Sequence, residues 1–235
     1  METRLDRLAL LWGKDAVNRL HSAKVLVIGC GAVGSYAIEA LARGGIGHLG
    51  LVDFDVVSIS NINRQLFALN STVGELKTTV AVRRIKDISP DIETTVFNVK
   101  TDSAKTEEIL NQFKPDFVID AIDSLGAKVD LIEKLQEMKI PFISSMGAAL
   151  KENVGNIATA KMKNTKNCTL AAFVRKRLRR RNVDLNFPCV YSDELPIKAI
   201  ETGENEERSK LGSLPTVTGI FGLYAAHYAL RYLKG

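Results

Sequence analysis

The sequence predicts an α/β fold: a doubly wound, mainly parallel sheet with helices on both faces and added strands toward the C-terminus. Three observations lead to this prediction. Short apolar runs rich in β-branched residues, such as residues 25–28 and 117–121, alternate with amphipathic helical segments. A glycine motif follows the first run, and polar residues follow several others. Repeated strand–helix units require right-handed crossovers, which place helices on both faces of a parallel sheet.

The composition argues against several classes of protein. The 235 residues suffice for one large α/β domain and are few for two, and 46% of them are hydrophobic. The start, METRLDRLAL, carries charges where a signal peptide needs an apolar core, and no apolar run approaches the length of a membrane span. The three cysteines, Cys30, Cys168 and Cys189, form no C-x-x-C pair, which argues against a disulfide framework and a four-cysteine zinc site. We therefore expect a cytoplasmic protein.

The first strand leads into a glycine motif that can bind a phosphate. Residues 25–28 predict a buried strand, and Gly29, Gly31 and Gly34 follow with the spacing G-x-G-x-x-G. The first glycine permits a tight turn, the second lets a phosphate approach the backbone, and the third lets the next helix pack closely on the sheet. That helix, predicted over residues 33–42, directs free N–H groups toward an anion. These features predict a Rossmann-like site for a nucleotide or a dinucleotide.

Polar residues after the second strand narrow the class of ligand. Asp53 follows the strand predicted over residues 48–52, where a carboxylate can bond ribose hydroxyls. The polar cluster beyond it exceeds what a dehydrogenase needs. Arginine offers a planar fork to phosphate oxygens and lysine a point charge, and a lysine in the first turn of a helix opposes the helix dipole, which favours a functional role. The cluster comprises Asp55, Asn61, Arg64, Gln65 and Lys77.

A further carboxylate, Asp123, follows the strand predicted over residues 117–121. It is placed at the edge of the sheet where ligands bind, and a carboxylate is a hard oxygen ligand suited to Mg²⁺. The alternative interpretation is an N-cap for the helix predicted over residues 125–138. Taken together, these residues predict binding of ATP with Mg²⁺, with the developing charge stabilised by Arg64 and Lys77.

The remaining elements are predicted from periodicity and from end signals. Residues 1–23 form an amphipathic helix or a pair of helices. We expect one domain over residues 1–235, in which 24–147 is the nucleotide-binding core and 148–235 carries the substrate region and the final helix. The other predicted helices cover residues 73–88 (capped by Ser71 or Thr72), 103–113 (capped by Asp102 or Ser103), 164–182 and 216–233; the other strands cover 93–99, 140–144, 154–160 and 187–191; and a charged surface loop covers 192–212.

Several of these motifs resemble those of a known family. The segments GCGAVGSYAIEALARGGIG, LVDFDVVSISNINRQ, GELK and VIDAIDS resemble the adenylating superfamily, which includes ubiquitin-activating enzymes and bacterial activators of sulfur-carrier proteins. RLDRLALLWGKDAV, ALARGGIG and PCVYSDE are most similar to the bacterial tRNA threonylcarbamoyladenosine dehydratases. The resemblance covers Arg4 to Tyr191 and the final helix. Many sulfur-carrier activators carry two C-x-x-C pairs, and their absence from this sequence favours the dehydratases.

The resemblance implies a reaction. A substrate carboxylate attacks the α-phosphate of ATP, and the resulting acyl-adenylate is attacked by a nucleophile. In the dehydratases the carboxylate belongs to a modified adenosine beside the tRNA anticodon, and ring closure within that side chain releases AMP. Three alternatives stay open: activation of the C-terminal glycine of a ubiquitin-like sulfur-carrier protein, a nicotinamide-dependent oxidoreductase, and a nucleotide-binding partner subunit without activity.

The resemblance also implies roles for individual residues. Arg7 matches an arginine that reaches into the ATP site of a partner subunit, which implies a homodimer. Cys189 matches the proposed catalytic cysteine, although ring closure does not require a thioester and a small buried residue is the alternative. A monovalent cation and a sulfur-transfer partner are further possibilities. The three motif glycines form the phosphate loop, Asp53 binds the ribose, Asn61, Arg64, Gln65 and Lys77 line the phosphates, and Asp123 binds the metal.

A basic run lies in the predicted helix over residues 164–182. Six of the seven residues 175–181 are cations, whereas Leu170, Val174 and Leu178 recur at helical spacing. We therefore expect this helix to pack against the protein through one side and to expose a cationic side. A solvated helix face is the ordinary interpretation of such a run. In a candidate tRNA-modifying enzyme with a net charge of +5, the run favours binding of the RNA backbone.

Overall fold

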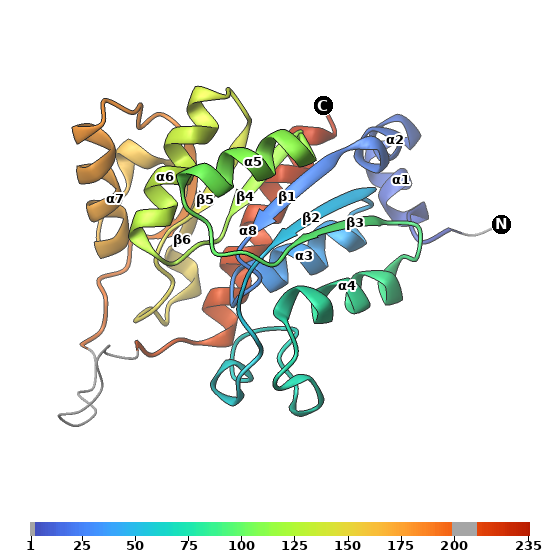
Figure 1. Ribbon diagram of the computed structural model, residues 1–235, viewed down its shortest axis with the longest axis horizontal. Coiled ribbons are helices and arrows are strands. Elements are labelled where there is room, and N and C mark those ends of the chain that lie inside the picture. The colour runs from blue at the N-terminus through green and yellow to red at the C-terminus, as the bar shows by residue number, and fades with distance from the viewer. Residues whose placement is uncertain (1–2, 199–210) are drawn as a thin grey trace.

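The computed structural model describes residues 3–198 and 211–235 (Figure 1). Its centre is a seven-stranded sheet with the order β3-β2-β1-β4-β5-β7-β6. Neighbouring strands are parallel except β6, which pairs antiparallel with β7. The strands are β1 (Lys24–Ile28), β2 (His48–Val52), β3 (Glu93–Phe97), β4 (Phe117–Asp120), β5 (Phe142–Ser145), β6 (Ile157–Lys161) and β7 (Pro188–Ser192). The predicted doubly wound, mainly parallel sheet with added C-terminal strands is confirmed.

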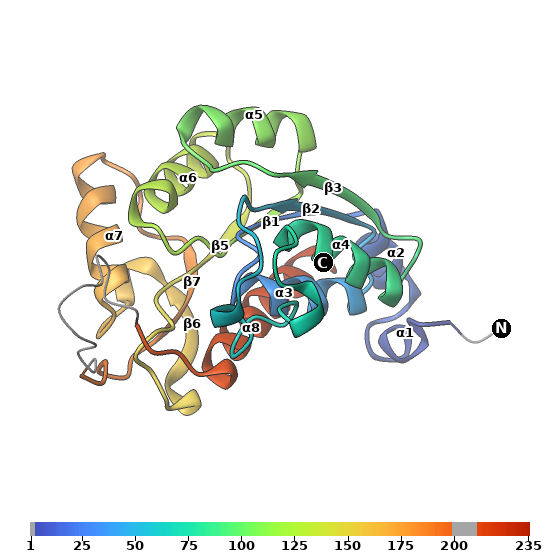
Figure 2. The same cartoon turned by 60° about the horizontal axis from the view of Figure 1, so that its bottom comes forward.

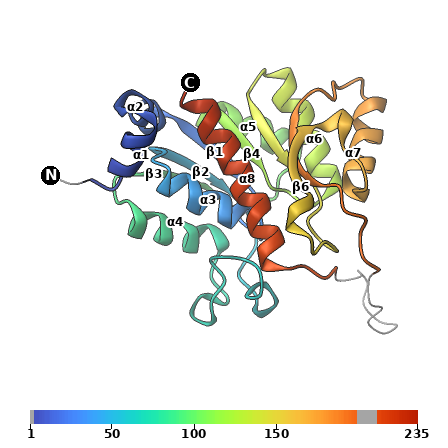
Figure 3. The ribbon, with the colours of Figure 1, turned by 180° about the vertical axis from the view of Figure 1, so that it is seen from behind.

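Two layers of helices cover the sheet, one on each face. Figure 1 shows α5 and α6 in front of the sheet, whereas Figure 3, seen from behind, shows α8 in front. The apolar side chains of α3, α4 and α8 pack on one face, and those of α5, α6 and α7 pack on the other. The helices are α1 (Asp6–Trp12), α2 (Lys14–Ser22), α3 (Gly34–Arg43), α4 (Lys77–Ile88), α5 (Ser103–Phe113), α6 (Leu125–Glu137), α7 (Thr169–Arg180) and α8 (Pro215–Leu233). Within the two described ranges, no helix has both the length and the apolar content that crossing a membrane requires.

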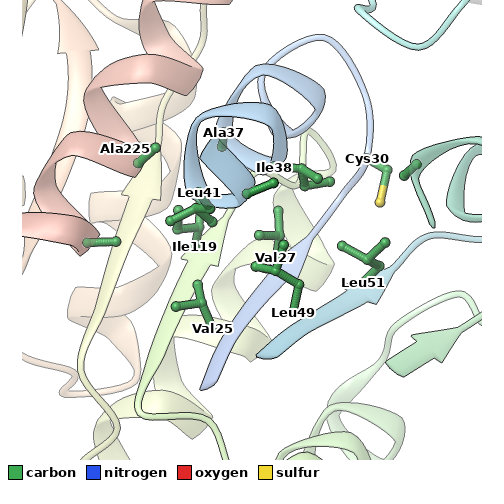
Figure 4. Packing of buried hydrophobic residues seen from close by; sticks show 14 of the residues in the cluster. Val25, Val27, Cys30, Ala37, Ile38, Leu41, Leu49, Leu51, Ile119 and Ala225 are labelled. Atoms are coloured by element: carbon green, nitrogen blue, oxygen red, sulfur yellow. The ribbon is translucent and has the colours of Figure 1, made fainter. Parts of the chain in front are cut away.

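The core beside the glycine motif is formed by β1, β2 and α3. Val27 and Leu49 project from the strands toward Ile38 and Leu41 of α3 (Figure 4). All four side chains are fully buried. Burial of one such side chain stabilises the fold by roughly 1.5–3 kcal/mol. This packing fixes α3 on the sheet and therefore places the N-terminus of α3 at the end of β1.

The main correction to the predicted elements concerns α4. The helix predicted over residues 73–88 begins instead at Lys77. The preceding backbone instead turns at Gly74 and pairs with the loop after β2, where the Gly74 N–H donates to the Val57 carbonyl at 2.9 Å and the Val57 N–H donates to the Glu75 carbonyl at 2.8 Å. Backbone groups that pair with another segment cannot also form helical hydrogen bonds. The predicted caps, Ser71 and Thr72, consequently lie in a separate short 3₁₀ helix (Asn70–Thr72).

The other elements agree with the prediction to within a few residues, except that α7 is several residues shorter than its predicted range. The N-terminal segment is a pair of helices that meet at Gly13, whose φ of +84° suits glycine. Asp102 caps α5, since its carboxylate accepts the Lys105 N–H at 2.9 Å. Of the predicted surface loop, residues 199–210 lie outside the described residues.

Candidate functional site

Strand register brings most of the predicted site residues, but not Arg7 and Cys189, to one edge of the sheet. Ile28 at the end of β1 pairs with Val52 of β2 and with Asp120 of β4, so the loops that follow these strands emerge together. The chain leaves β1 toward β2 and leaves β4 toward β5, which makes the gap between β1 and β4 a topological switch point where ligands bind. Figure 2 turns this edge toward the viewer, with the loop between β2 and α4 in front.

Two of the three motif glycines are required by the turn between β1 and α3. Gly29 has φ +95°, and a Cβ there would lie 2.7 Å from the Ala121 carbonyl oxygen. A Cβ on Gly34 would lie 1.7 Å from the Gly29 carbonyl oxygen. Gly31 differs, because its Cβ would meet only the Gln65 amide nitrogen, at 3.8 Å. The first and third glycines are therefore required by the packing, while the second leaves open space in which a phosphate can approach the backbone.

The Asp53 carboxylate connects the loop that follows β1 to the loop that follows β2. One carboxylate oxygen accepts the Cys30 N–H at 2.7 Å, and the other accepts the Asp55 N–H at 2.9 Å. A carboxylate oxygen has a second lone pair, so both remain able to accept hydrogen bonds from ribose hydroxyls. Burial raises the pKa of the Cys30 thiol well above its usual value, which agrees with a packing role for this cysteine.

Lys77 and Asp55 form an ion pair at the same edge. Lys77 Nζ lies 2.7 Å from Asp55 Oδ2, although Lys77 is only 7% exposed. The Lys77 N–H also donates to the Asp55 carbonyl at 3.0 Å, so backbone pairing at the start of α4 determines where the side chain begins. A lysine ammonium has three donors, which leaves it able to bond phosphate oxygens as well as Asp55.

The segment from Asn61 to Gln65 lies in the loop between β2 and α4. The Asn61 side chain accepts the Ser58 N–H at 3.2 Å and is buried, as is Gln65. The Arg64 guanidinium donates to the Ser60 carbonyl at 2.7 Å and to the Asn63 side chain at 2.9 Å. Both acceptors are uncharged, so these contacts orient the guanidinium without neutralising its charge.

Asp123 is exposed in the turn between β4 and α6. The N-cap position of α6 is Ser124, so the alternative interpretation of Asp123 as the helix cap is wrong. Within residues 3–198 and 211–235, no three His, Cys, Asp or Glu side chains are grouped to hold an ion. A metal at Asp123 would therefore complete its shell with phosphate and water oxygens, as Mg²⁺ commonly does.

The model of the ThiF family matches residues 5–235. The chain belongs to the ThiF family. Among its relatives, the tRNA threonylcarbamoyladenosine dehydratase of Bacillus subtilis is 37% identical over 226 residues, covering 93% of this chain and 87% of the relative. The molybdopterin-synthase adenylyltransferase of Haemophilus influenzae is 35% identical over 137 residues, which cover 58% of this chain and 55% of the relative.

Solved structures agree with this membership of the ThiF family. The E. coli tRNA N6-threonylcarbamoyladenosine dehydratase in complex with AMP matches with a TM-score of 0.89 at 32% identity, covering 98% of this chain and 93% of that one. The same E. coli protein in complex with ATP matches with the same TM-score, identity and coverage.

Two predicted catalytic residues lie apart from the edge of the sheet that carries the glycine turn. Arg7 is exposed on α1, and α1 begins next to Leu5, which lies close to Gly45 just before β2. Arg7 therefore belongs to the opposite edge of the sheet from Gly29. Cys189 is fully buried in β7, where its thiol lies 3.4 Å from the Ala160 carbonyl oxygen. Burial, together with Cys168, raises the pKa of the Cys189 thiol to about 12.

Sequence reasoning missed a buried polar group behind the site. Asp120, Lys128 and Ser144 are fully buried and in mutual contact. Two signals could have found them: an aspartate ends the apolar run FVI, and Lys128 lies at helical spacing with the buried Leu131 and Leu135.

The raised pKa of Cys189 predicts a loss of stability in alkali. Between its usual value of 9.0 and about 12, the folded thiol keeps a proton that the unfolded chain releases. The free energy of unfolding should therefore fall with rising pH, by about 1.4 kcal/mol per pH unit for one such thiol. Urea unfolding at pH 8, 9 and 10 should show a shallower decline for Cys189→Ala than for the parent, with Val190→Ala, at a fully buried position of the same strand, as a control for lost volume. Identical slopes for the parent and Cys189→Ala would contradict the protonated thiol.

Proposed function

We propose that this protein is an ATP-dependent adenylating enzyme that dehydrates threonylcarbamoyladenosine next to a tRNA anticodon. The observation that carries the proposal is the Lys77–Asp55 pair at 2.7 Å beside the glycine turn. A dinucleotide site needs the glycine turn and Asp53, but not an almost buried lysine at the same edge. The names of the relatives, and the ATP and AMP complexes of the similar E. coli structure, support the same assignment.

The residues at the switch point fit ATP and a magnesium ion. The open space over Gly31 admits a phosphate chain, and Asp53 has free lone pairs for the ribose. We assign Asn61, Arg64, Gln65 and Lys77 to the phosphates and Asp123 to Mg²⁺. When bound, Mg²⁺ neutralises charge on the phosphate oxygens.

The proposed reaction has two steps. An oxygen of the substrate carboxylate attacks the α-phosphorus, and the bond to pyrophosphate breaks. A nucleophile of the same side chain then attacks the acyl carbon, the ring closes, and AMP leaves. The nucleoside thus loses one water while ATP becomes AMP and pyrophosphate. Arg64 and Lys77 stabilise the charge that develops on the phosphate oxygens in the first step.

The direct test is to incubate the protein with ATP, Mg²⁺ and tRNA that carries threonylcarbamoyladenosine. We expect AMP release together with loss of one water from the nucleoside, measured by mass spectrometry. The similarity to molybdopterin-synthase adenylyltransferases supports a second candidate, activation of a sulfur-carrier protein. Release of pyrophosphate from ATP with such a carrier and none with tRNA would favour that candidate. Calorimetry that showed tight binding of NAD and none of ATP would exclude both.

Variants of the phosphate site should lose activity while keeping the fold. Lys77→Met, Arg64→Ala and Asp123→Ala each remove one preorganised charge, which typically lowers the rate by about two to three orders of magnitude. Arg83→Met is the matched control, because Arg83 lies on the same helix as Lys77 but pairs outward with Glu75 at 3.0 Å. AMP release is the measurement, with circular dichroism to check folding. Near-parental turnover in a folded variant would refute the role of that residue.

A homodimer with shared sites is part of the proposal. Arg7 lies on the edge opposite its own glycine turn, and the adjacent Leu10 and Leu11 are 82% and 71% exposed. Exposed neighbouring leucines favour burial against another surface. A second copy that covers α1 would bring Arg7 to a site of that copy, in keeping with the family resemblance.

Mixing protomers tests this arrangement. Arg7→Ala and Asp123→Ala proteins should each be inactive alone. After subunit exchange, part of the activity should return, because some mixed dimers contain one site with both residues. AMP release is measured before and after mixing, and labelled protomers verify the exchange. An absence of recovery after verified exchange would show that Arg7 serves no neighbouring site.

We assign the tRNA to α7. Ala171, Val174 and Leu178 are buried, so α7 is docked by one side as predicted. Two of the six cations of the run are engaged within the chain. Arg181 lies 2.7 Å from both Asp130 and Glu133 of α6, and the partly buried Arg175 bonds the Thr165 hydroxyl. The other four cations of the run, Lys176, Arg177, Arg179 and Arg180, are exposed.

An exposed aromatic residue accompanies these cations. Phe173 is 51% exposed, and Lys176, Arg177 and Arg180 follow it at helical spacing on the same face. Anticodon-loop bases are partly unstacked, and aromatic side chains are common stacking partners for such bases. The face therefore combines the two features that single-stranded RNA binding requires, a cationic surface and a stacking platform.

Charge reversal on α7 should weaken tRNA binding and its salt dependence. Replacing Lys176, Arg177 and Arg180 by Glu removes up to three phosphate contacts, which should flatten the slope of log K against log salt by about 2. Replacing Lys105, Lys114 and Lys139 by Glu changes the net charge equally and serves as the control. Phe173→Ala should weaken binding at every salt concentration without a change of slope. Unchanged tRNA binding by the α7 triple variant would locate the RNA site elsewhere.

The catalytic role of Cys189, the monovalent cation, the sulfur-transfer partner and the cytoplasmic location stay predictions. The buried, protonated thiol of Cys189 favours packing in the free protein.

A further inference from the structure

A buried ion pair lies directly behind the turn that carries Asp123. Lys128 Nζ is 2.7 Å from Asp120 Oδ2 and 3.3 Å from the Ser144 hydroxyl, which itself donates to Asp120 Oδ2 at 2.5 Å. The side chains of Lys128 and Asp120 are fully buried. Neither residue can reach a ligand at the edge of the sheet, so the proposed reaction leaves the pair without a direct role.

Stability alone does not account for this pair. The cost of removing two charges from water can exceed their attraction, and apolar residues of similar volume often replace such pairs without loss of stability. The neighbours of both positions in the sequence are buried and apolar: Phe117–Ile119 precede Asp120, and Val129 and Leu131 follow Lys128. An apolar pair would therefore be the simpler solution if packing were the only requirement.

The second carboxylate oxygen connects the pair to the site. Asp120 Oδ1 accepts the Ile122 N–H at 3.0 Å, within the turn between β4 and α6. The preceding residue, Ala121, donates to the Ile28 carbonyl at 2.9 Å, and its own carbonyl lies against Gly29. Asp120 thus fixes the turn at Ile122, and the glycine motif fixes it at Ala121. Asp123 directly follows these two residues.

We propose that Asp120 and Lys128 are positioning residues that set the place of Asp123 at the ATP site. Lys128 binds one oxygen of Asp120, which leaves the other oxygen for the Ile122 N–H. Lys128 also neutralises a carboxylate on the same turn as Asp123, which would otherwise repel a triphosphate. The inference rests on the proposed function, in which Asp123 binds Mg²⁺ with ATP.

Two double variants separate positioning from packing. Asp120→Asn/Lys128→Met and Asp120→Leu/Lys128→Met both remove the two charges and keep similar volumes. Only the first keeps an acceptor for the Ile122 N–H. The readouts are the thermal midpoint, hydrogen exchange of the Ile122 amide by NMR, and the Mg²⁺ concentration that half-saturates ATP binding in calorimetry, which needs no tRNA.

We expect both variants to fold and to differ at the site. In the leucine variant the Ile122 amide should exchange faster, and the required Mg²⁺ concentration should rise about 10-fold, as for the loss of other partners that orient a metal ligand. The asparagine variant should stay close to the parent. If the leucine variant fails to fold, Asp120→Ala/Lys128→Met removes the same acceptor without added bulk and is judged by the same readouts.

Asp123→Ala distinguishes failure of this inference from failure of the proposed function. If Asp123→Ala leaves the Mg²⁺ dependence of ATP binding unchanged, the proposed role of Asp123 is wrong and the inference falls with it. If Asp123→Ala raises the Mg²⁺ requirement but the folded leucine variant behaves like the parent, Asp120 and Lys128 do not position Asp123. A parental exchange rate of the Ile122 amide in that variant would lead to the same conclusion.

Discussion

The site depends on the contact between Gly34 and Gly29. The absence of a Cβ on Gly34, which would lie 1.7 Å from the Gly29 carbonyl oxygen, lets α3 begin directly against the end of β1. Gly29 in turn admits the Ala121 carbonyl of the turn that follows β4. Three segments far apart in the sequence thereby converge at one switch point, and α3 begins shortly after Gly31, whose carbonyl accepts the Ser35 N–H at 2.9 Å. Any larger side chain at the first or third glycine would separate the elements that carry the phosphate site.

Much of this arrangement could be predicted because it depends on local spacing. The glycine motif specifies a turn, and Asp53 and Asp123 each follow an apolar run that must end at the ligand-binding edge of a parallel sheet. Lys77 could also be assigned, since a cation at the start of a helix opposes the dipole and suggests a functional reason. In each case the argument needs only the neighbours of the residue in the sequence and the rules of strand–helix units.

Contacts between distant segments could not be predicted in this way. The predicted start of α4 was wrong because the backbone at Gly74 pairs with Val57. Local helix propensity gives no sign of this pairing. The pairing of Asp120 with Lys128 depends on which side chains of β4 and α6 meet inside the protein. Which cation of the basic run pairs with carboxylates depends on the packing of α7 beside α6, because Arg181 there forms ion pairs with two carboxylates of α6.

The partners of the cations indicate what each is available to bind. The charges of Lys128 and Arg181 are compensated by carboxylates of the same chain, the first in the core and the second between two helices. Arg64 instead donates to uncharged oxygens at the nucleotide edge, so its orientation is fixed while its charge stays available to an anion. Lys77 is intermediate: its carboxylate partner, Asp55, is 48% exposed, so water already competes for that carboxylate before any phosphate binds. Compensated cations stabilise the scaffold, and uncompensated cations whose position is fixed are suited to bind a polyanion. This distinction supports the proposed assignment of two separate anion-binding surfaces, the edge of the sheet around Gly31 for a triphosphate and the outer face of α7 for an RNA backbone.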